Sequence, residues 1–229
     1  MDQGALDSVR RLSNHRIRRK APDISPVNDG GHIMFLSPPP ESEAVARVYR
    51  SSLDSQGFVM NLTRAWAWRP DIFDGFAALR SQLTDNSSLS KRELAVIVCA
   101  TAAGLGDSYC ALAWGKKLAE ASNPESAAAV LQASTTDELS SRERALSDWA
   151  RKVVTNPNGT TTEDIANLRA TGFAEQEIAE ATIFVAFRIA FSTVNDALGA
   201  CPDWELVDAA PREVVTAVTF GRSPIARDA

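Results

Sequence analysis

The sequence predicts an all-α fold, and three observations support this prediction. Long stretches are rich in Ala, Leu, Glu and Arg, whereas Gly and Pro gather in clusters between them. Within these stretches apolar residues recur three or four positions apart, which is the spacing of a helix face. No segment shows the alternation or the β-branched enrichment of a sheet. Because 229 residues suffice for one stable core, we expect a single helical domain over residues 41–229, preceded by an arm over residues 1–40.

The first 40 residues are expected to form an extended arm. Pro22, Pro26, the cluster Asn28-Asp-Gly-Gly31 and the run Pro38-Pro-Pro40 do not allow a continuous helix. A basic segment runs from Arg10 to Lys20. The simplest interpretation of this segment is an arm that is solvated or wraps a partner.

Two helices are predicted directly after the arm. Residues 41–53 have helical spacing, with Val45 and Val48 on one side, and Gln56-Gly57 is expected to end this helix. A Trp-rich turn follows. Pro70 suits the first position of a helix that continues through Leu83, because proline has no amide hydrogen to lose there.

The sequence Ser90-Lys-Arg-Glu93 is a capping box, so a helix is expected to begin here. Apolar residues surround this helix almost completely, which predicts burial on every side up to Gly104 or Gly106. A second helix is expected from Asp107. Four more are expected to begin near Asn123-Pro124, Ser140, Thr161 and Glu175, the last of them long enough to reach Leu198.

Charge and cysteine content exclude several classes of protein. The net charge is −5, and the body after residue 35 is more acidic than the whole, so we expect no nucleic-acid partner. Three scattered cysteines have no disulfide or metal-ligand spacing. The most apolar run, residues 181–191, is interrupted by Arg188 and is shorter than the ~18 residues that a membrane span needs. With no apolar signal segment either, we expect a soluble cytoplasmic protein without a membrane or metal partner.

Several motifs follow one another in an order that resembles a known superfamily. They are Leu89-Ser-Lys-Arg-Glu93, Gly106-Asp-Ser-Tyr-Cys110, Leu139-Ser-Ser-Arg-Glu-Arg-Ala-Leu146, Gly172-Phe-Ala-Glu-Gln-Glu-Ile-Ala-Glu-Ala181 and Asp196-Ala-Leu-Gly199. Together they resemble the peroxidase-related branch of the alkylhydroperoxidase D/carboxymuconolactone decarboxylase superfamily over about residues 45–200. The resemblance implies an alkylhydroperoxidase D-like multi-helix bundle. It also implies a homo-oligomer, from dimer to hexamer, with active sites near subunit contacts.

The departures from this superfamily concern its redox residues. By the resemblance, a Glu that passes protons through a His to a Cys pair falls on Ala95, and the His falls on Trp114. The first Cys of the degenerate Cys-x-x-Cys motif falls on Asp107, and only Cys110 remains. A dithiol peroxidase needs a thiolate to attack peroxide and a second thiol to resolve the sulfenic acid. We therefore expect this chemistry to be lost.

The candidate catalytic residues are Asp107 and Cys110, which share a helix face with Trp114. Asp107 would act as acid or base, although its simplest role is a helix N-cap, and Cys110 alone is more often a small core residue. Trp114 would form an aromatic wall. Arg188 would anchor a substrate carboxylate, or else pair with an acidic residue across a subunit interface. Lower-ranked substrate-binding candidates are Ser192, Asn195 and His32.

These observations predict a repurposed pocket that binds a small organic acid or aromatic compound. Cofactor-free decarboxylase, lyase or isomerase chemistry is the reaction class we expect there. One alternative is an antioxidant peroxidase that uses Cys110 alone with an external thiol. Another is a non-catalytic interaction protein whose arm docks on a partner.

Overall fold

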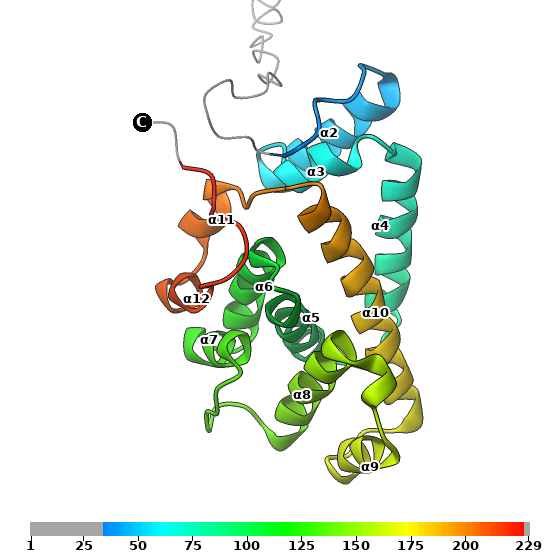
Figure 1. Ribbon diagram of the computed structural model, residues 1–229, viewed down its shortest axis with the longest axis vertical. Helices are drawn as coiled ribbons and strands as arrows, with labels where there is room; N and C mark the ends of the chain where they lie inside the picture. Colours follow the sequence, from blue (N-terminus) through cyan, green and yellow to red (C-terminus); the bar gives the residue numbers. More distant parts are fainter. Residues whose placement is uncertain (1–33, 227–229) are drawn as a thin grey trace, which may run out of the picture.

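The structure, a computed structural model, describes residues 34–226 (Figure 1). This part of the chain contains helices and no strand, which confirms the all-α prediction. The helices of the first half are α2 (Glu43–Gln56), α3 (Asn61–Trp66), α4 (Pro70–Asp85), α5 (Lys91–Leu105) and α6 (Ser108–Ala121). Those of the second half are α7 (Pro124–Gln132), α8 (Ser141–Thr155), the 3-10 helix η1 (Pro157–Gly159), α9 (Thr162–Ala170), α10 (Glu175–Ala197), α11 (Trp204–Ala209) and α12 (Arg212–Ala217).

Helix α5 forms the centre of the core and packs against α6, α7, α8 and α10 (Figure 1). Every residue from Leu94 to Ala102 is buried, as its all-round apolar sequence predicts. The helix ends at Gly106, which has a φ of 77° in the left-handed region that glycine adopts without strain. This tight turn lets α6 begin at once and run back along α5.

The N-termini of α5 and α8 each carry a capping box, and ion pairs between the two boxes join the helices. The Ser90–Glu93 and Ser140–Glu143 boxes are both formed. Arg92 of the first box binds Glu143 of the second, and Arg142 of the second binds Glu93 of the first. Each glutamate thus caps its own helix and fixes the neighbouring one.

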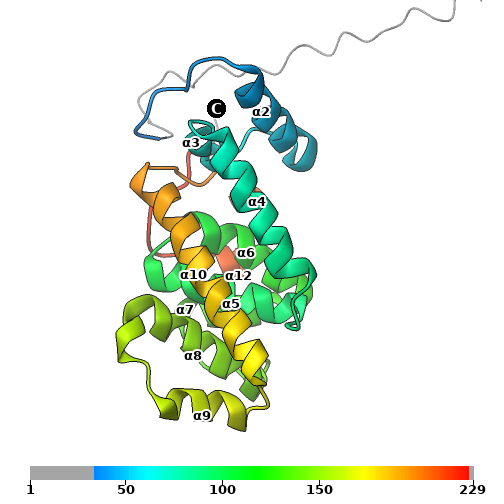
Figure 2. The same ribbon diagram turned by 90° about the vertical axis from the view of Figure 1, so that its right-hand side faces the viewer.

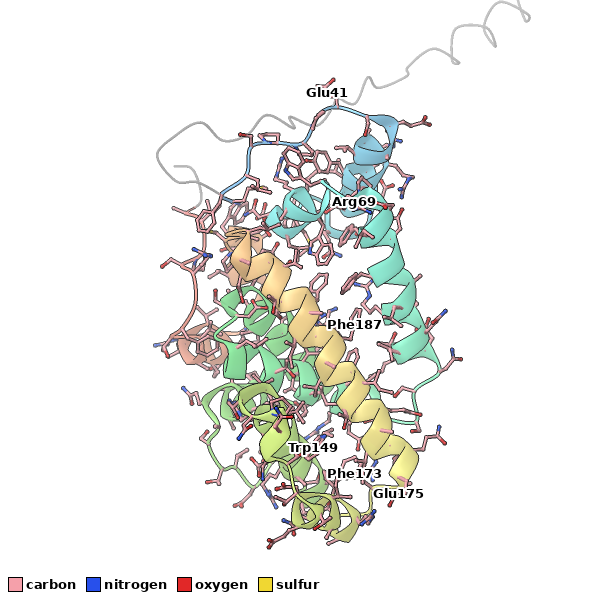
Figure 3. All side chains as sticks on the ribbon, turned by 45° about the vertical axis from the view of Figure 1, so that its right-hand side comes forward. Glu41, Arg69, Trp149, Phe173, Glu175 and Phe187 are labelled. Atoms are coloured by element: carbon pink, nitrogen blue, oxygen red, sulfur yellow. The ribbon has the colours of Figure 1, made fainter. Side chains whose placement is uncertain are left out.

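Helices α4 and α10 run in opposite directions along one side of the molecule, as Figures 2 and 3 show from two angles. Arg69 lies at the start of α4 and Glu175 at the start of α10, at opposite ends of this pair (Figure 3). No residue of α4 is fully buried, although Phe76 and Leu83 pack against the core. The incomplete packing of α4 leaves room for a cavity between this helix and α6.

Three short helices were not expected from the sequence. The Trp-rich segment forms α3 instead of a turn, and the tail after Cys201 forms α11 and α12. Each of these helices has six residues, which is too short to produce a periodic apolar pattern. Their stability therefore comes from packing, as for Val214 of α12, which is fully buried.

The arm predicted over residues 1–40 stays a prediction, because the structure describes only its last residues. Residues 34–42 precede α2 without forming a helix, and Phe35 donates its backbone amide to the Leu198 carbonyl at 2.9 Å. Arg222 lies 4.6 Å above the Phe35 ring. The rest of the arm, with His32, lies outside the described residues. Among the helices of the described part, none is long and apolar enough to cross a membrane.

Candidate functional site

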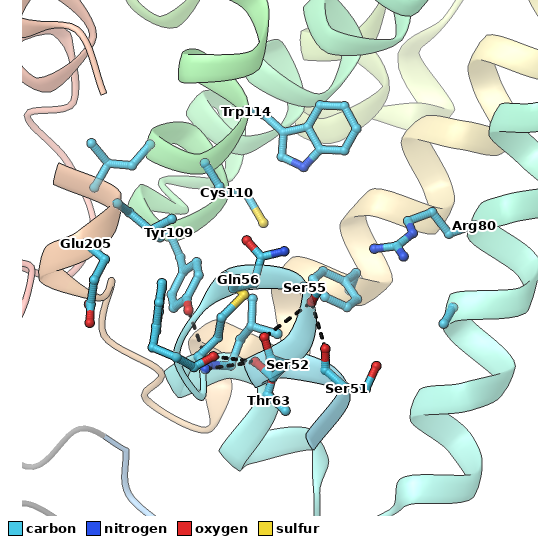
Figure 4. A pocket seen from close by; sticks show the side chains of 18 of the residues that line it. Ser51, Ser52, Ser55, Gln56, Thr63, Arg80, Tyr109, Cys110, Trp114 and Glu205 are labelled. Carbon is cyan, nitrogen blue, oxygen red and sulfur yellow. Dashed lines mark hydrogen bonds between the residues drawn. The ribbon is translucent and has the colours of Figure 1, made fainter. Parts of the chain in front are cut away.

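A cavity of about 820 Å³ lies between α4, α6 and α10 and extends toward α2, α3 and α11 (Figure 4). Its two ends differ in chemistry. Aromatic rings line the end near α10, namely Phe73, Phe76, Trp114, Phe187 and Phe191. Hydroxyl and amide groups line the end near α2, namely Ser51, Ser52, Ser55, Gln56 and Thr63. The cavity therefore suits a molecule with an apolar ring and a polar extension.

Cys110 lies on α6, and its Sγ points into the cavity (Figure 4). Arg188 of α10 donates from Nη2 to this sulfur at 2.9 Å, and the Ser192 hydroxyl lies 3.7 Å from it. Burial, followed by repulsion from Asp107, raises the pKa of the Cys110 thiol, while the Arg188 charge opposes the rise. The thiol is consequently protonated at neutral pH when the cavity holds no ligand.

Arg188 is the most unusual charge of the site. Its side chain is only 3% exposed, and its guanidinium lies 5.5 Å from the centroid of the Trp114 ring and 4.9 Å from that of Phe191. The buried Nε has no hydrogen-bond partner. Within residues 34–226 Arg188 forms no ion pair with a carboxylate. A buried guanidinium without a counter-ion is costly, so this arrangement favours an anionic ligand.

Two further cations face Arg188 from other helices. Arg80 reaches into the cavity from α4 (Figure 4), and Lys117 of α6 lies with its Nζ 4.2 Å from the centroid of the Trp114 ring. Burial and repulsion by Arg188 lower the pKa of Arg80. Three positive charges on three helices thus surround the aromatic end. Their mutual repulsion is unfavourable in the empty cavity, and a bound anion would reduce it.

Asp107 lies at the start of α6, and its catalytic role stays a prediction. It is the N-cap of α6, as its position after Gly106 predicts, and its Oδ1 accepts from the Cys110 amide at 2.9 Å. The side chain is fully buried, is not among the residues that line the cavity, and leaves Oδ2 without a partner. Its charge contributes, after burial, to raising the pKa of Asp196 to about 7.

The remaining predicted residues are separated by the fold. Trp114 lines the cavity, whereas Ser192 and Asn195 do not. Ser192 contacts the Cys110 sulfur, and Asn195 accepts a hydrogen bond from the Trp66 indole at 2.8 Å. The fold thus brings Cys110, Trp114 and Arg188 together at the cavity, with Ser192 behind the sulfur. The ligand-binding roles of Ser192 and Asn195 remain predictions.

A second buried acid lies near the cavity, on the side of α3 and α11. The Tyr109 hydroxyl, which lines the cavity, donates to Asp203, and the Asn61 amide donates to the same carboxylate at 3.0 Å. Burial raises the pKa of Asp203 to about 7. This group joins α3, α6 and the start of α11, and no sequence pattern indicated it because the three residues are far apart in the chain.

Sequence reasoning also missed Arg80 and Lys117. Lys117 follows Trp114 by three positions and Cys110 by seven, so helical spacing already placed it on their face. Arg80 follows Phe76 by four positions on the apolar face of α4. The helical spacing of both residues could therefore have indicated the cavity. A charged residue at the edge of an apolar stripe is usually solvated, however, so the spacing alone did not single them out.

The chain is similar to solved structures of one fold family. An "alkylhydroperoxidase AhpD core" structure, of an uncharacterized peroxidase-related protein from Ralstonia eutropha JMP134, is 26% identical with a TM-score of 0.66, covering 77% of this chain and 96% of its own. An uncharacterized peroxidase-related protein from Silicibacter sp. TM1040 is 21% identical with a TM-score of 0.67, covering 79% and 97%. A complex of a cysteine-to-alanine variant of the debrominase Bmp8 with 2,3,4-tribromopyrrole is 17% identical with a TM-score of 0.64, covering 79% and 96%.

Neither a protein-family model nor a curated protein matches the sequence. The structural neighbours nevertheless confirm the resemblance that the motifs predict: the chain has the all-helical AhpD-like fold. On this fold the site is a cationic, aromatic cavity beside a single cysteine.

Proposed function

We propose that this protein binds a small organic acid with an aromatic or apolar body and acts on it without a redox dithiol. The observation that carries the proposal is the buried Arg188 guanidinium, which has an unpartnered Nε and no carboxylate counter-ion in the described part of the chain. A ligand carboxylate would pair with the guanidinium of Arg188, and Arg80 and Lys117 would add attraction at longer range. The ligand ring would lie against Trp114 and Phe191.

The reaction class that we propose is cofactor-free decarboxylation or isomerisation. The protonated Cys110 thiol lies beside the guanidinium that would hold the acid, so it does not resemble the thiolate of a peroxidase. The debrominase neighbour, whose complex contains a small halogenated pyrrole, supports an aromatic ligand in a cavity of this fold. Asp107 is a poorer candidate for the acid or base, because it does not line the cavity.

The binding step is tested with benzoate, phenylacetate and cinnamate, each compared with its neutral amide by calorimetry. We expect the acids to bind and the amides to bind at least ~30-fold more weakly, since removing one partner of a buried charge pair costs ~2 kcal/mol or more. Arg188→Gln should cause a similar loss with the acids. Arg169→Gln, an exposed arginine on α9, is the control that should change nothing.

Arg80→Gln keeps the test decisive if Arg188→Gln does not fold, because Arg80 is exposed on α4. This variant should weaken the binding of the acids by about 3-fold to 10-fold, as expected for a partly screened charge. Equal affinity for acids and amides in the native protein would contradict the proposal.

A second candidate is chemistry at Cys110 itself, and the 2.9 Å contact with Arg188 favours it. A guanidinium at this distance stabilises a thiolate once the thiol loses its proton, so the contact supports a slow one-cysteine peroxidase. Mild hydrogen peroxide followed by dimedone should then label Cys110, with Cys99 as the buried internal control. Absence of label on Cys110 removes this candidate.

A further inference from the structure

We propose that Lys117 is a nucleophilic amine that forms an imine with a β-keto acid held in the cavity, and so carries out its decarboxylation. The inference deepens the proposed function and rests on it, because Arg188 would hold the carboxylate. Lys117 and Arg188 both lie over the Trp114 ring, with Nζ 4.2 Å and Cζ 5.5 Å from its centroid. The aromatic end of the cavity therefore offers an amine and a carboxylate anchor to the same small molecule.

The surroundings of Lys117 favour the neutral, nucleophilic amine. Partial burial of the amine is the largest effect that lowers the pKa of Lys117, followed by repulsion from Arg80 and Arg188. Glu120 opposes this change, and so does the cation–π attraction of the Trp114 ring for the protonated amine. Burial and repulsion outweigh them, so more free amine is present at neutral pH than for an ordinary lysine.

Access to the amine is also suitable. The Lys117 side chain as a whole is exposed while it lines the cavity, so a carbonyl compound can reach Nζ from solvent. Lys116, the next residue, also lines the cavity but pairs with Glu120 at 3.7 Å. Arg80 and Arg188 repel the charge of Lys117, whereas Lys116 has a carboxylate partner, which makes Lys116 an internal control.

The reaction balances without a cofactor. The neutral amine of Lys117 adds to the keto carbon, one proton is taken up from solvent and water leaves, giving a protonated imine. The electron pair of the bond to the carboxylate then moves toward the iminium nitrogen as carbon dioxide departs, leaving an enamine. The enamine carbon takes a proton from water, and hydrolysis releases a ketone and the free amine. In sum, a β-keto acid anion and one proton give a ketone and carbon dioxide.

The experiment traps the imine by reduction. Protein is incubated with acetoacetate and sodium borohydride at pH 7.5, and the modified lysines are identified by peptide mass spectrometry. We expect Lys117 to be modified at least ~10-fold faster than Lys116, because the lowered pKa of Lys117 leaves more of its amine unprotonated at this pH. Modification of both lysines at equal rates, or of neither, would overturn the proposal.

Two variants separate this proposal from the proposed function. Lys117→Arg keeps the charge and removes the nucleophile, so it should abolish trapping and carbon dioxide release while acid binding persists. Arg188→Gln should slow trapping by acetoacetate more than trapping by its uncharged ethyl ester, because only acetoacetate loses its carboxylate anchor while both lose part of the repulsion that keeps Lys117 unprotonated. If acids bind through Arg188 but Lys117 is never trapped, only the imine proposal fails. If acids do not bind at all, the proposed function fails as well.

Discussion

Asp107 replaces a redox cysteine by the resemblance, and in the structure it caps α6 with Oδ1. Capping and catalysis place different demands on this residue, so two substitutions separate them. Asn can cap a helix as Asp does, whereas Ala cannot. Thermal or urea unfolding should show that Asp107→Ala lowers the free energy of unfolding by ~1 kcal/mol and that Asp107→Asn leaves it nearly unchanged. Turnover that survives in Asp107→Asn would exclude this carboxylate as the acid or base.

Two carboxyls, the half-buried Asp196 and the buried Asp203, make stability depend on pH. Burial raises the pKa of both Asp196 and Asp203 from 3.8 to about 7. The folded protein therefore binds more protons than the unfolded chain between about pH 4 and 7. Stability must fall as the pH rises through this window, because unfolding releases protons there. At lower pH this contribution is fully present.

Melting temperatures measured from pH 4.5 to 7.5 test this expectation. Asp196→Asn cannot titrate, so its melting temperature should fall less across the window than that of the native protein. Asp71→Asn is the control, because Arg69 holds the pKa of the exposed Asp71 at about 2, outside the window. An unchanged pH slope in Asp196→Asn would show that Asp196 does not titrate in this range.

At the scale of elements, Arg142 joins three helices. It binds Glu93 of α5 at 2.6 Å and Glu177 of α10, and its guanidinium stacks 3.7 Å above the Phe173 ring. The carboxylates of Glu93 and Glu177 are only 12% and 17% exposed. Without Arg142, both would remain charged and partly desolvated with no counter-ion. Removing Arg142 should therefore cost more stability than breaking a surface ion pair and less than breaking a fully buried one.

Arg142→Gln should therefore lower the free energy of unfolding by ~2 kcal/mol, measured by urea denaturation. The matched control is Arg169→Gln, whose pair with Glu175 is exposed on both sides and should contribute ~0.5 kcal/mol or less. If the two variants lose equal stability, Arg142 does not hold α5, α8 and α10 together.

At the scale of the whole molecule, one face is left open. The outer side of α10 carries Ala179, Ile183, Ala186 and Ala190, all exposed, and α4, which runs along α10 (Figure 2), exposes Ile72 and Leu79. Small residues at helical spacing allow close approach of another helix. The homo-oligomer implied by the resemblance stays a prediction, and we propose that a second copy of the chain covers this face.

Sedimentation velocity tests that proposal. If the native chain is an oligomer, Ile183→Lys combined with Leu79→Lys should convert it to smaller species, because two charges cannot be buried without partners. Gln132→Lys, exposed on α7, should leave the sedimentation coefficient unchanged. An oligomer that resists the double substitution would place its interface elsewhere.

The sequence by itself determined the helices of nine or more residues and where most of them begin. Capping boxes, Pro70, Asn123-Pro124 and Gly106 are local signals that act within one turn, so they could be read without the fold. The sequence also showed that only one thiol of the redox pair remains and that Arg188 interrupts an apolar helix. These are statements about neighbours in the chain.

Only the tertiary structure decided which side chains meet. Arg80, Lys117 and Arg188 come from three helices, and their convergence depends on how α4, α6 and α10 pack. The same packing places Cys110 at the cavity and Asp107, three residues away, behind its wall. Helical periodicity fixes the face on which a residue lies, but contacts between distant segments decide what that face meets.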